Sequence, residues 1–192
     1  ILTAIFTSIF GGVNTLWDRR YGFMNKALTS PISRSAIALG KMSAISLIAA
    51  LQASLIIGIA LAIGVTFPNP LMIIPIMGIV ILFSLGFSGI SVTLAATAKS
   101  QETFWGMINL LGMPLFMLSP ALFPLELLPN WLAVIAKLNP VTYTVLLVRE
   151  LMTGVSEGGI PILISIGVIF AFVIAMVAIT SYVFTREVNK PF

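Results

Sequence analysis

The segment TSPISRSAIALGK, residues 29–41, has the residue types that come nearest to a nucleotide-binding motif. A phosphate-binding loop requires Gly, four residues and then Gly-Lys-Ser/Thr after a strand, because backbone N–H groups surround the phosphates and the hydroxyl holds Mg²⁺. Gly40 and Lys41 match the end of that pattern, but Ser35 stands where the first glycine is needed and Met42 replaces the hydroxyl. We therefore expect no nucleotide binding by this chain.

Composition removes most other catalytic chemistry. The 192-residue chain contains no Cys and no His, which excludes disulfides, thiolate nucleophiles, histidine bases and the usual zinc sites. Intramembrane hydrolysis has no catalytic pair either, because no Ser or Asp can be combined with a His. We expect no catalytic residue, no metal site and no cofactor bound by this chain, which is not expected to be an enzyme by itself.

Hydropathy defines the class of protein. Hydrophobic residues make up 59% of the chain and charged residues only 8%, and so few charges cannot cover the apolar surface of a soluble domain. Several uncharged runs reach the length of about 20 residues that a helix needs to cross a membrane. No alternating barrel pattern is visible, and backbone groups in lipid must bond within their own segment. The sequence predicts an all-α, polytopic transmembrane helical bundle.

Apolar runs and the polar breaks between them predict the order of the spans. The chain opens inside an apolar run without an initiator Met, so we expect a span end there and a missing first span before it. Residues 123–159 are too rich in proline and charge for one straight span, which favours short interfacial or re-entrant helices. The expected parts of this single domain (1–192) are a span end at 1–16, a polar loop at 17–41, spans at 42–65, 71–98 and 103–122, the re-entrant region at 123–159 and a last span at 160–185.

The distribution of Lys and Arg predicts which loops face the cytoplasm. In this layout the loop at 17–41, the turn after residue 98 and the C-terminal tail share one side of the membrane. That side carries eight basic residues and the other side two: Arg19, Arg20, Lys26, Arg34, Lys41, Lys99, Arg186 and Lys190 against Lys137 and Arg149. Because positively charged loops stay inside, we expect the 17–41 loop and the C-terminus to be cytoplasmic and residues 123–159 to face outward.

The basic loop begins with a helical pattern. Apolar residues at Trp17, Tyr21, Met24 and Leu28 follow spacings of four, three and four, which predict one face of a helix. Arg19 and Lys26 fall nearly opposite that face. The pattern predicts a short amphipathic helix along the cytoplasmic membrane surface, where its basic residues would contact anionic lipid.

The same loop ends with basic residues at the start of the next span. The helix should stop before Pro31, because a proline disfavours helical geometry at the residue before it. We expect Arg34 and Lys41 to anchor the following span at lipid phosphates, with contact to a partner protein as the alternative.

Two amides are the bulkiest polar side chains inside the expected spans. An amide is costly in lipid unless it finds a partner, so for Gln52 and Asn109 an interhelical hydrogen bond is favoured over a substrate contact. Together with Met113 they form the candidate substrate pathway. Close helix packing within the subunit is favoured for a stripe of small residues: Ser84, Ser88, Ser91, Ala95 and Ala98. No acid or base lies near the centre of a span, which indicates an energy source elsewhere.

Two blocks of the sequence carry a family resemblance. The first is DRRYGF at 18–23, followed by LTSPISR at 28–34 and Gly40-Lys41, and it resembles the loop after the second span in ABC type-2 (ABC-2 type) transporter permeases. The second is SPALFPLELLPNW at 119–131, continuing to LNPVTY at 138–143, and it is similar to the outward-facing re-entrant region of that family. The resemblance covers essentially the whole chain and implies a six-span permease.

The resemblance implies roles for both blocks. In the family, the first block is a coupling helix that docks into a groove of a separate ATP-binding subunit. The implied ATPase-coupling residues are Trp17, Asp18, Arg19, Arg20, Tyr21, Gly22, Phe23, Met24, Lys26 and Leu28. The implied re-entrant residues are Pro124, Glu126, Pro129, Asn139, Pro140, Tyr143 and Arg149. Many members have Gly-Thr where this chain has Gly22-Phe23, and the Gly-Phe version resembles the drug-resistance exporter subgroup.

The function implied is the membrane-spanning subunit of an ATP-driven exporter in the plasma (inner) membrane. ATP and Mg would be bound by the partner ATPase, a second permease subunit would complete a homo- or heterodimer, and membrane lipid, but no nucleic acid, would contact the chain. A hydrophobic or amphipathic cargo, drug-like or lipid-linked, suits the apolar walls. The alternatives are a passive channel or ion-coupled carrier, and a membrane scaffold that transports nothing.

Overall fold

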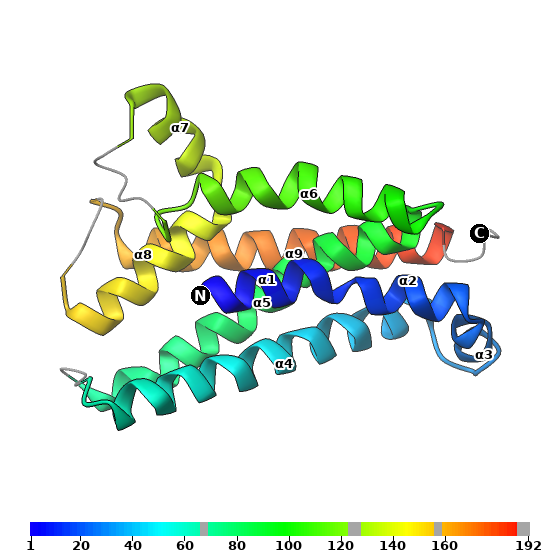
Figure 1. Cartoon of the computed structure of the whole chain (residues 1–192), viewed down its shortest axis with the longest axis horizontal. Helices are drawn as coiled ribbons and strands as arrows, with labels where there is room; N and C mark the ends of the chain where they lie inside the picture. Colours follow the sequence, from blue (N-terminus) through cyan, green and yellow to red (C-terminus); the bar gives the residue numbers. More distant parts are fainter. Residues whose placement is uncertain (66–68, 123–127, 156–158, 188–192) are drawn as a thin grey trace.

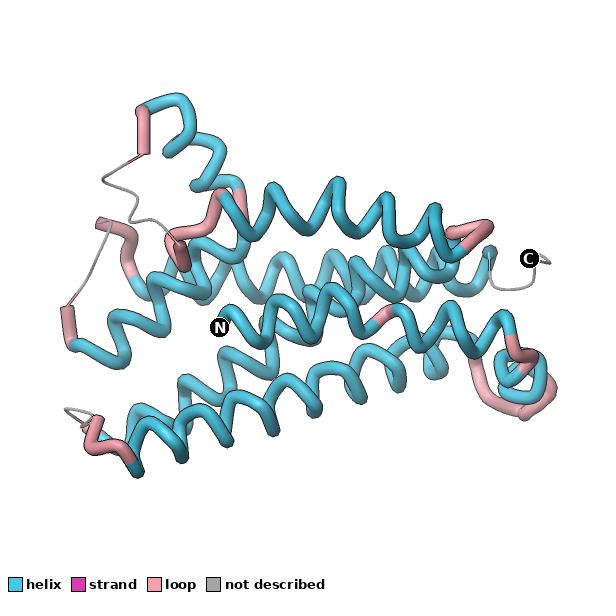
Figure 2. Tube along the Cα trace, in the orientation of Figure 1, coloured by secondary structure: helices cyan, strands magenta, loops and turns pink. Residues whose placement is uncertain are grey.

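A computed structural model describes residues 1–65, 69–122, 128–155 and 159–187, and every regular element in those ranges is helical (Figures 1 and 2). The elements are α1 (Leu2–Gly11), α2 (Val13–Arg20), α3 (Phe23–Leu28), α4 (Arg34–Ala62), the 3-10 turn η1 (Pro70–Met72), α5 (Ile73–Thr97), α6 (Gln101–Met117), α7 (Asn130–Leu138), α8 (Pro140–Thr153) and α9 (Ile162–Glu187).

Three helical segments are long and apolar enough to cross a membrane. They are Arg34–Ala62, Pro70–Thr97 and Ile162–Glu187, with mean hydropathies of 2.3, 2.4 and 3.1. The pair α7 and α8 would add a fourth span if its two helices were counted together, but they meet at an angle of 89°. The prediction of an all-α, membrane-spanning bundle is confirmed, and the bent pair lies inside the region where short re-entrant helices are expected.

Two helix boundaries differ from the predicted ones. α4 begins at Arg34, well before the expected start at residue 42, because the Ser33 hydroxyl accepts a hydrogen bond from the Ala36 amide (3.3 Å) and caps the helix. α6 ends at Met117, earlier than the expected end at residue 122, and Pro120 follows where the chain can no longer continue a helix. The polar loop is therefore shorter than predicted, and so is α6.

α5 is the central helix of the bundle. It packs against α1, α4, α8 and α9, and its stripe of small residues is buried, with Ser84, Ser88 and Ser91 at 0% exposure. Hydroxyl groups bond to backbone carbonyls across the helices: Ser46 Oγ to Ile81 O (2.7 Å) and Thr180 Oγ1 to Gly89 O (3.1 Å). The stripe packs within the subunit, as predicted, because small side chains let backbones approach closely.

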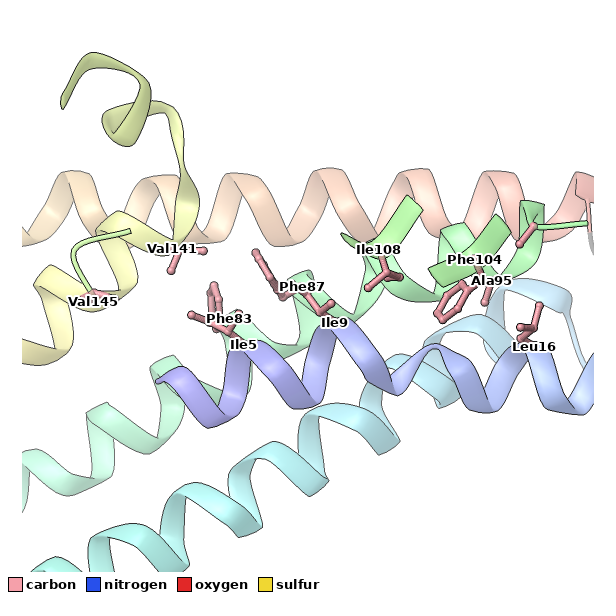
Figure 3. Packing of buried hydrophobic residues seen from close by; sticks show 11 residues of the cluster. Ile5, Ile9, Leu16, Phe83, Phe87, Ala95, Phe104, Ile108, Val141 and Val145 are labelled. Carbon is pink, nitrogen blue, oxygen red and sulfur yellow. The ribbon is translucent and has the colours of Figure 1, made fainter. Parts of the chain in front are cut away.

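A second set of contacts holds α1, α5, α6 and α8 together. Phe83 and Phe87 of α5 lie against Ile5 of α1 and Val141 of α8, and their rings stack with centroids 4.8 Å apart (Figure 3). These side chains are at most 1% exposed. Burial of this size is typical of a rigid interior, so α1, α5 and α8 are held in fixed relative positions at this contact.

Candidate functional site

The α2–α3 corner, which we define as residues 17–28, lies at the end of the bundle where α4 begins and α5 and α9 end (Figure 1). α2 stops at Arg20, and α3 starts at Phe23 after a turn in which Gly22 has a φ of 76°. A left-handed φ favours glycine and interrupts a helix. The prediction of one amphipathic helix through residues 17–28 is therefore wrong: the corner is two helices joined by a sharp turn.

The turn presents aromatic side chains to the outside. Tyr21 is 64% exposed and Phe23 is 60% exposed. The Tyr21 ring stacks on Trp17 (centroids 5.4 Å apart, planes 7° apart), and the Lys26 ammonium lies 5.7 Å from the Phe23 ring centroid. Arg20 is exposed and lies 5.9 Å from the Trp17 ring centroid. The corner thus combines exposed aromatic rings with two nearby cations, a composition typical of protein-binding surfaces.

One side chain of the corner anchors it to the bundle. Met24 is 2% exposed and packs in a cluster of residues from α4, α5 and α9, with Leu28 of the same helix partly buried against it. The cluster includes Met42, Val92 and Phe184. A force applied at the corner would therefore act directly on three long helices.

Arg19 points into the bundle, and its predicted place opposite the buried face is wrong. Its Nη1 donates to the carbonyl oxygens of Ala95 and Ala96 (both 2.8 Å) and of Ala98 (3.2 Å). These are the last carbonyls of α5, which carry the negative end of the helix dipole. Burial lowers the pKa of Arg19 from its ordinary value, and the charge of Glu187 opposes that shift. The difference arises because the buried side of α2 carries Thr15 and Leu16, next to Arg19, whereas Trp17 is only half-buried and Tyr21 is exposed.

The other charged groups near the corner also have protein partners. Asp18 forms an ion pair with Lys41 of α4. The Arg34 guanidinium donates to the Thr185 carbonyl of α9 (3.0 Å). The structure therefore directs Arg34 and Lys41 toward protein groups, where anchoring at lipid phosphates was expected. Contacts between α2 and α4 and between α4 and α9 fix the helix ends around the corner.

A hollow of about 270 Å³ separates the corner from the turn between α5 and α6. It is lined by Leu16, Trp17 and Arg20 on one side and by residues 99–102 on the other. The Arg20 Nη1 reaches Gln101 Oε1 at 3.4 Å. Hydrogen bonds from the backbone and from Ser100 lower the pKa of Glu102, and Arg20 adds to that effect, so the hollow holds charges of both signs.

The three candidate pathway residues have different surroundings. Gln52 is half-buried and accepts a hydrogen bond from the Thr7 hydroxyl of α1, which confirms the predicted interhelical bond. Asn109 is exposed and donates to the Trp105 carbonyl (2.9 Å) of its own helix, so the interhelical bond predicted for it is wrong. Met113 is 53% exposed. Asn109 and Met113 lie on one face of α6, whereas Gln52 lies on α4.

Aromatic side chains surround that face of α6. A small hollow between α1 and α6 is lined by Asn109, Met113 and Phe116 of α6 and by Phe6 and Phe10 of α1. The rings of Phe6 and Phe116 have centroids 4.9 Å apart, and Phe6 stacks on Phe10 at 5.9 Å. The face offers aromatic surface, a thioether and one amide, a combination suited to an apolar or amphipathic molecule.

The predicted re-entrant residues lie around the junction of α7 and α8. The Asn139 Nδ2 donates to the Leu115 carbonyl (2.6 Å), and its Oδ1 accepts from the Val141 amide (3.0 Å) and caps α8. Pro140 is the first residue of α8, and Pro129 precedes α7. The Tyr143 hydroxyl donates to the Lys137 carbonyl (2.7 Å), and Arg149 Nη2 donates to the Pro120 carbonyl (2.9 Å). Pro124 and Glu126 lie outside the described residues.

The polar contacts of this region are structural. Asn139 is 4% exposed and ties the start of α8 to the last turn of α6. In the part of the chain that the structure describes, no three His, Cys, Asp or Glu side chains come together as a metal site. Hydrogen bonds and packing hold the bent helix pair in position.

The fold and these contacts define a multi-pass membrane protein with one bent helix pair and an aromatic corner at its polar end. The ABC-2 type transporter family model matches residues 1–153, and the chain belongs to that family. It is 32% identical over 159 residues to "Putative transport permease ycf38" of Pyropia yezoensis, covering 79% of this chain and 54% of the relative. It is 31% identical over 152 residues to the protein of the same name in Cyanophora paradoxa, covering 77% of this chain and 52% of the relative.

A more distant relative comes from bacteria. "Probable multidrug ABC transporter permease YbhR" of Escherichia coli (strain K12) is 22% identical over 144 residues, covering 74% of this chain and 39% of the relative. The chain spans about half the length of the ycf38 relatives it matches. The predicted family is therefore confirmed.

Sequence reasoning missed two positions that the structure places at helix contacts. The Thr7 hydroxyl is the partner of Gln52, and its place on α1 could have been found only by pairing the two helices. The second position is Gly12, between α1 and α2, where an added Cβ would lie 2.4 Å from the Ser91 carbonyl oxygen. The signal available for Gly12 was the Gly11-Gly12 pair inside an apolar run, which is typical of a close helix approach.

Proposed function

We propose that this chain is the permease subunit of an ATP-driven exporter and that its α2–α3 corner docks a separate ATP-binding subunit. The observation that carries the proposal is the exposure of Tyr21 (64%) and Phe23 (60%) on a corner anchored by the buried Met24. Aromatic residues enriched at an exposed turn, with cations beside them, favour a protein partner.

The anchoring of the corner supports a mechanical role. Met24 packs against α4, α5 and α9, each of which is part of a segment long and apolar enough to span the membrane. A partner that moves the corner would therefore move the spans themselves. ATP and Mg would be bound by that partner, and this chain contributes a docking surface and a path through the membrane.

The orientation follows from charge. Arg20, Lys26, Arg34 and Lys99 all lie at the corner end of the bundle. Under the positive-inside rule that end faces the cytoplasm of a plasma (inner) membrane, and the α7–α8 pair faces outward. An ATP-binding subunit in the cytoplasm would meet the corner directly.

The cargo we propose is hydrophobic or amphipathic, drug-like or lipid-linked. The supporting observation is the face of α6 that carries Asn109 and Met113 beside Phe6 and Phe116. Such a surface binds by apolar and aromatic contact, with one amide to orient a polar group. A second permease subunit would close this face from the other side, and membrane lipid would cover the remaining apolar surface.

The test is ATP-dependent uptake of a fluorescent amphipathic dye into inside-out vesicles that contain the full-length permease and its ATPase. We expect uptake with ATP and none when the ATPase carries a substitution that stops hydrolysis. Dye movement that continues with the inactive ATPase would favour a passive channel or an ion-coupled carrier. The absence of movement of any dye or lipid in both preparations would favour a scaffold.

A further inference from the structure

The α1–α2 arm is fastened to α5 at two levels. At the first level, the Gly12 amide donates to the Ser91 hydroxyl (3.0 Å), which donates to the Ser8 carbonyl (2.8 Å). Both bonds are buried, and the backbones approach so closely that a side chain at Gly12 would collide with Ser91. This level fixes the middle of the arm against the C-terminal third of α5.

At the second level, the Arg19 side chain joins the end of α2 to the end of α5. Arg19 Nη1 donates to the Ala95, Ala96 and Ala98 carbonyls, and Ala98 is the C-cap residue directly after α5. The last carbonyls of a helix have no partner within the helix, so a guanidinium there satisfies them and interacts favourably with the dipole. The contact spans 76 to 79 residues of sequence.

Neighbouring charges do not duplicate this contact. Asp18 is paired with Lys41 of α4, and the Arg20 side chain is exposed and turned toward Gln101. Arg19 therefore makes a contact that Asp18 and Arg20 do not make, and it links the α2–α3 corner, of which it is a part, to the central helix of the bundle.

We propose that Arg19 is a positioning residue that makes α2 and α5 move as one body. This inference rests on the proposed function, because it concerns how movement of the α2–α3 corner by an ATPase reaches the membrane interior. Arg19 does this from within the bundle, through hydrogen bonds to α5. α5 also packs against α1, α4, α8 and α9. A displacement of α5 would therefore also move α1, which borders the hollow beside Asn109 and Met113, and α8 of the bent helix pair.

The experiment measures the distance between spin labels on the two helices. The chain has no Cys, so labels can be placed on Cys substitutions at Arg20, the last residue of α2, and at Ile74 of α5, both of which are exposed. The full-length permease, the Arg19→Gln variant and a charge-matched control, Lys137→Gln at the exposed end of α7, are compared. Each is measured alone, with the ATPase, and with the ATPase plus a non-hydrolysable ATP analogue.

We expect the native protein and Lys137→Gln to give one narrow distance that is the same in all three states. In Arg19→Gln the distance between the labels should no longer be the single native value, already in the isolated permease. It should change further when nucleotide is added, while the variant still binds the ATPase. A folded Arg19→Gln variant with the native distance in every state would overturn the proposal. A native distance that changes with nucleotide would also overturn it, and that result needs no variant. If the native permease binds no ATPase, the proposed function fails, and the isolated permease still tests Arg19.

Discussion

Replacement of Gly12 by alanine tests the close approach of the α1–α2 arm to α5. The added Cβ would lie 2.4 Å from the Ser91 carbonyl oxygen, 2.5 Å from its carbonyl carbon and 2.7 Å from its Oγ. Ordinary contact begins at 3.4 Å, so the arm would have to move away from α5 by about 1 Å. Two of the three atoms belong to the backbone and cannot rotate away. The shift would also stretch the bond from the Gly12 amide to Ser91, now 3.0 Å.

The expected cost follows from these contacts. Overpacking in a rigid interior costs about 1 to 3 kcal/mol, and a weakened buried hydrogen bond adds about 1 kcal/mol. We expect Gly12→Ala to lower the free energy of unfolding by about 2 to 4 kcal/mol. The assay is denaturant unfolding of the purified permease in a single detergent, followed by tryptophan fluorescence.

The matched control is Gly40→Ala. Gly40 lies inside α4, is exposed and has nothing within 4 Å of its added Cβ. Alanine there should stabilise the protein by about 0.5 to 1 kcal/mol, because glycine is the poorer helix former. Equal stability of Gly12→Ala and Gly40→Ala would refute the reasoning, since it would mean that the arm and α5 are not in close contact.

Two further predictions concern capping groups. Asn139→Ala should lower the free energy of unfolding by about 1 to 2 kcal/mol, because it removes the hydrogen bond that caps Val141 and the bond to the Leu115 carbonyl. The same denaturant unfolding measures this change, and an unchanged midpoint would contradict the capping role of Asn139. The pKa of Glu102 is lowered in the folded protein by bonds from the backbone and from Ser100, so its contribution to stability is present above the ordinary value of 4.5 and is lost as the pH falls through the lower folded value. Glu102→Gln should remove that part of the acid dependence of the unfolding midpoint, whereas an identical pH profile in both proteins would contradict it.

The spans could be predicted because hydropathy is a local property. Long uncharged runs are visible without knowledge of the partner helices, and α5 and α9 lie close to the ranges 71–98 and 160–185 predicted for them. The boundaries of α4 and α6 were less accurate because a cap at Ser33 and the proline at 120 decide them, and each is a single side chain.

The α2–α3 corner shows what a helical pattern leaves out. The spacing of Trp17, Tyr21, Met24 and Leu28 fits one helix, but such a spacing carries no information about the backbone dihedral angles. Gly22 adopts a φ of 76° and ends α2, and the exposed Phe23 follows directly. Gly22 is visible in the sequence, but whether it ends the helix could be decided only from the structure of the turn.

The contacts of Arg19 could not be predicted from the sequence. Its three acceptors are carbonyl oxygens of alanines 76 to 79 residues further along the chain, and every residue type has that carbonyl. Asn109 is a similar case, because the carbonyl of Trp105 in its own helix satisfies the amide that was expected to bond across helices. Hydrogen bonds to the backbone carry no signature in the sequence of the acceptor.

Co-purification tests the central claim, that the α2–α3 corner docks an ATP-binding subunit. The full-length permease is compared with a Tyr21→Ala, Phe23→Ala double variant, which removes the two exposed rings and leaves Met24 in place. The control is Tyr182→Ala, which removes another exposed ring (58%) at the same end of the bundle, on α9. We predict that the ATPase is recovered with the native protein and with Tyr182→Ala and is lost with the folded double variant. Recovery of the ATPase with the double variant at the native level, or with none of the three proteins, would contradict the account.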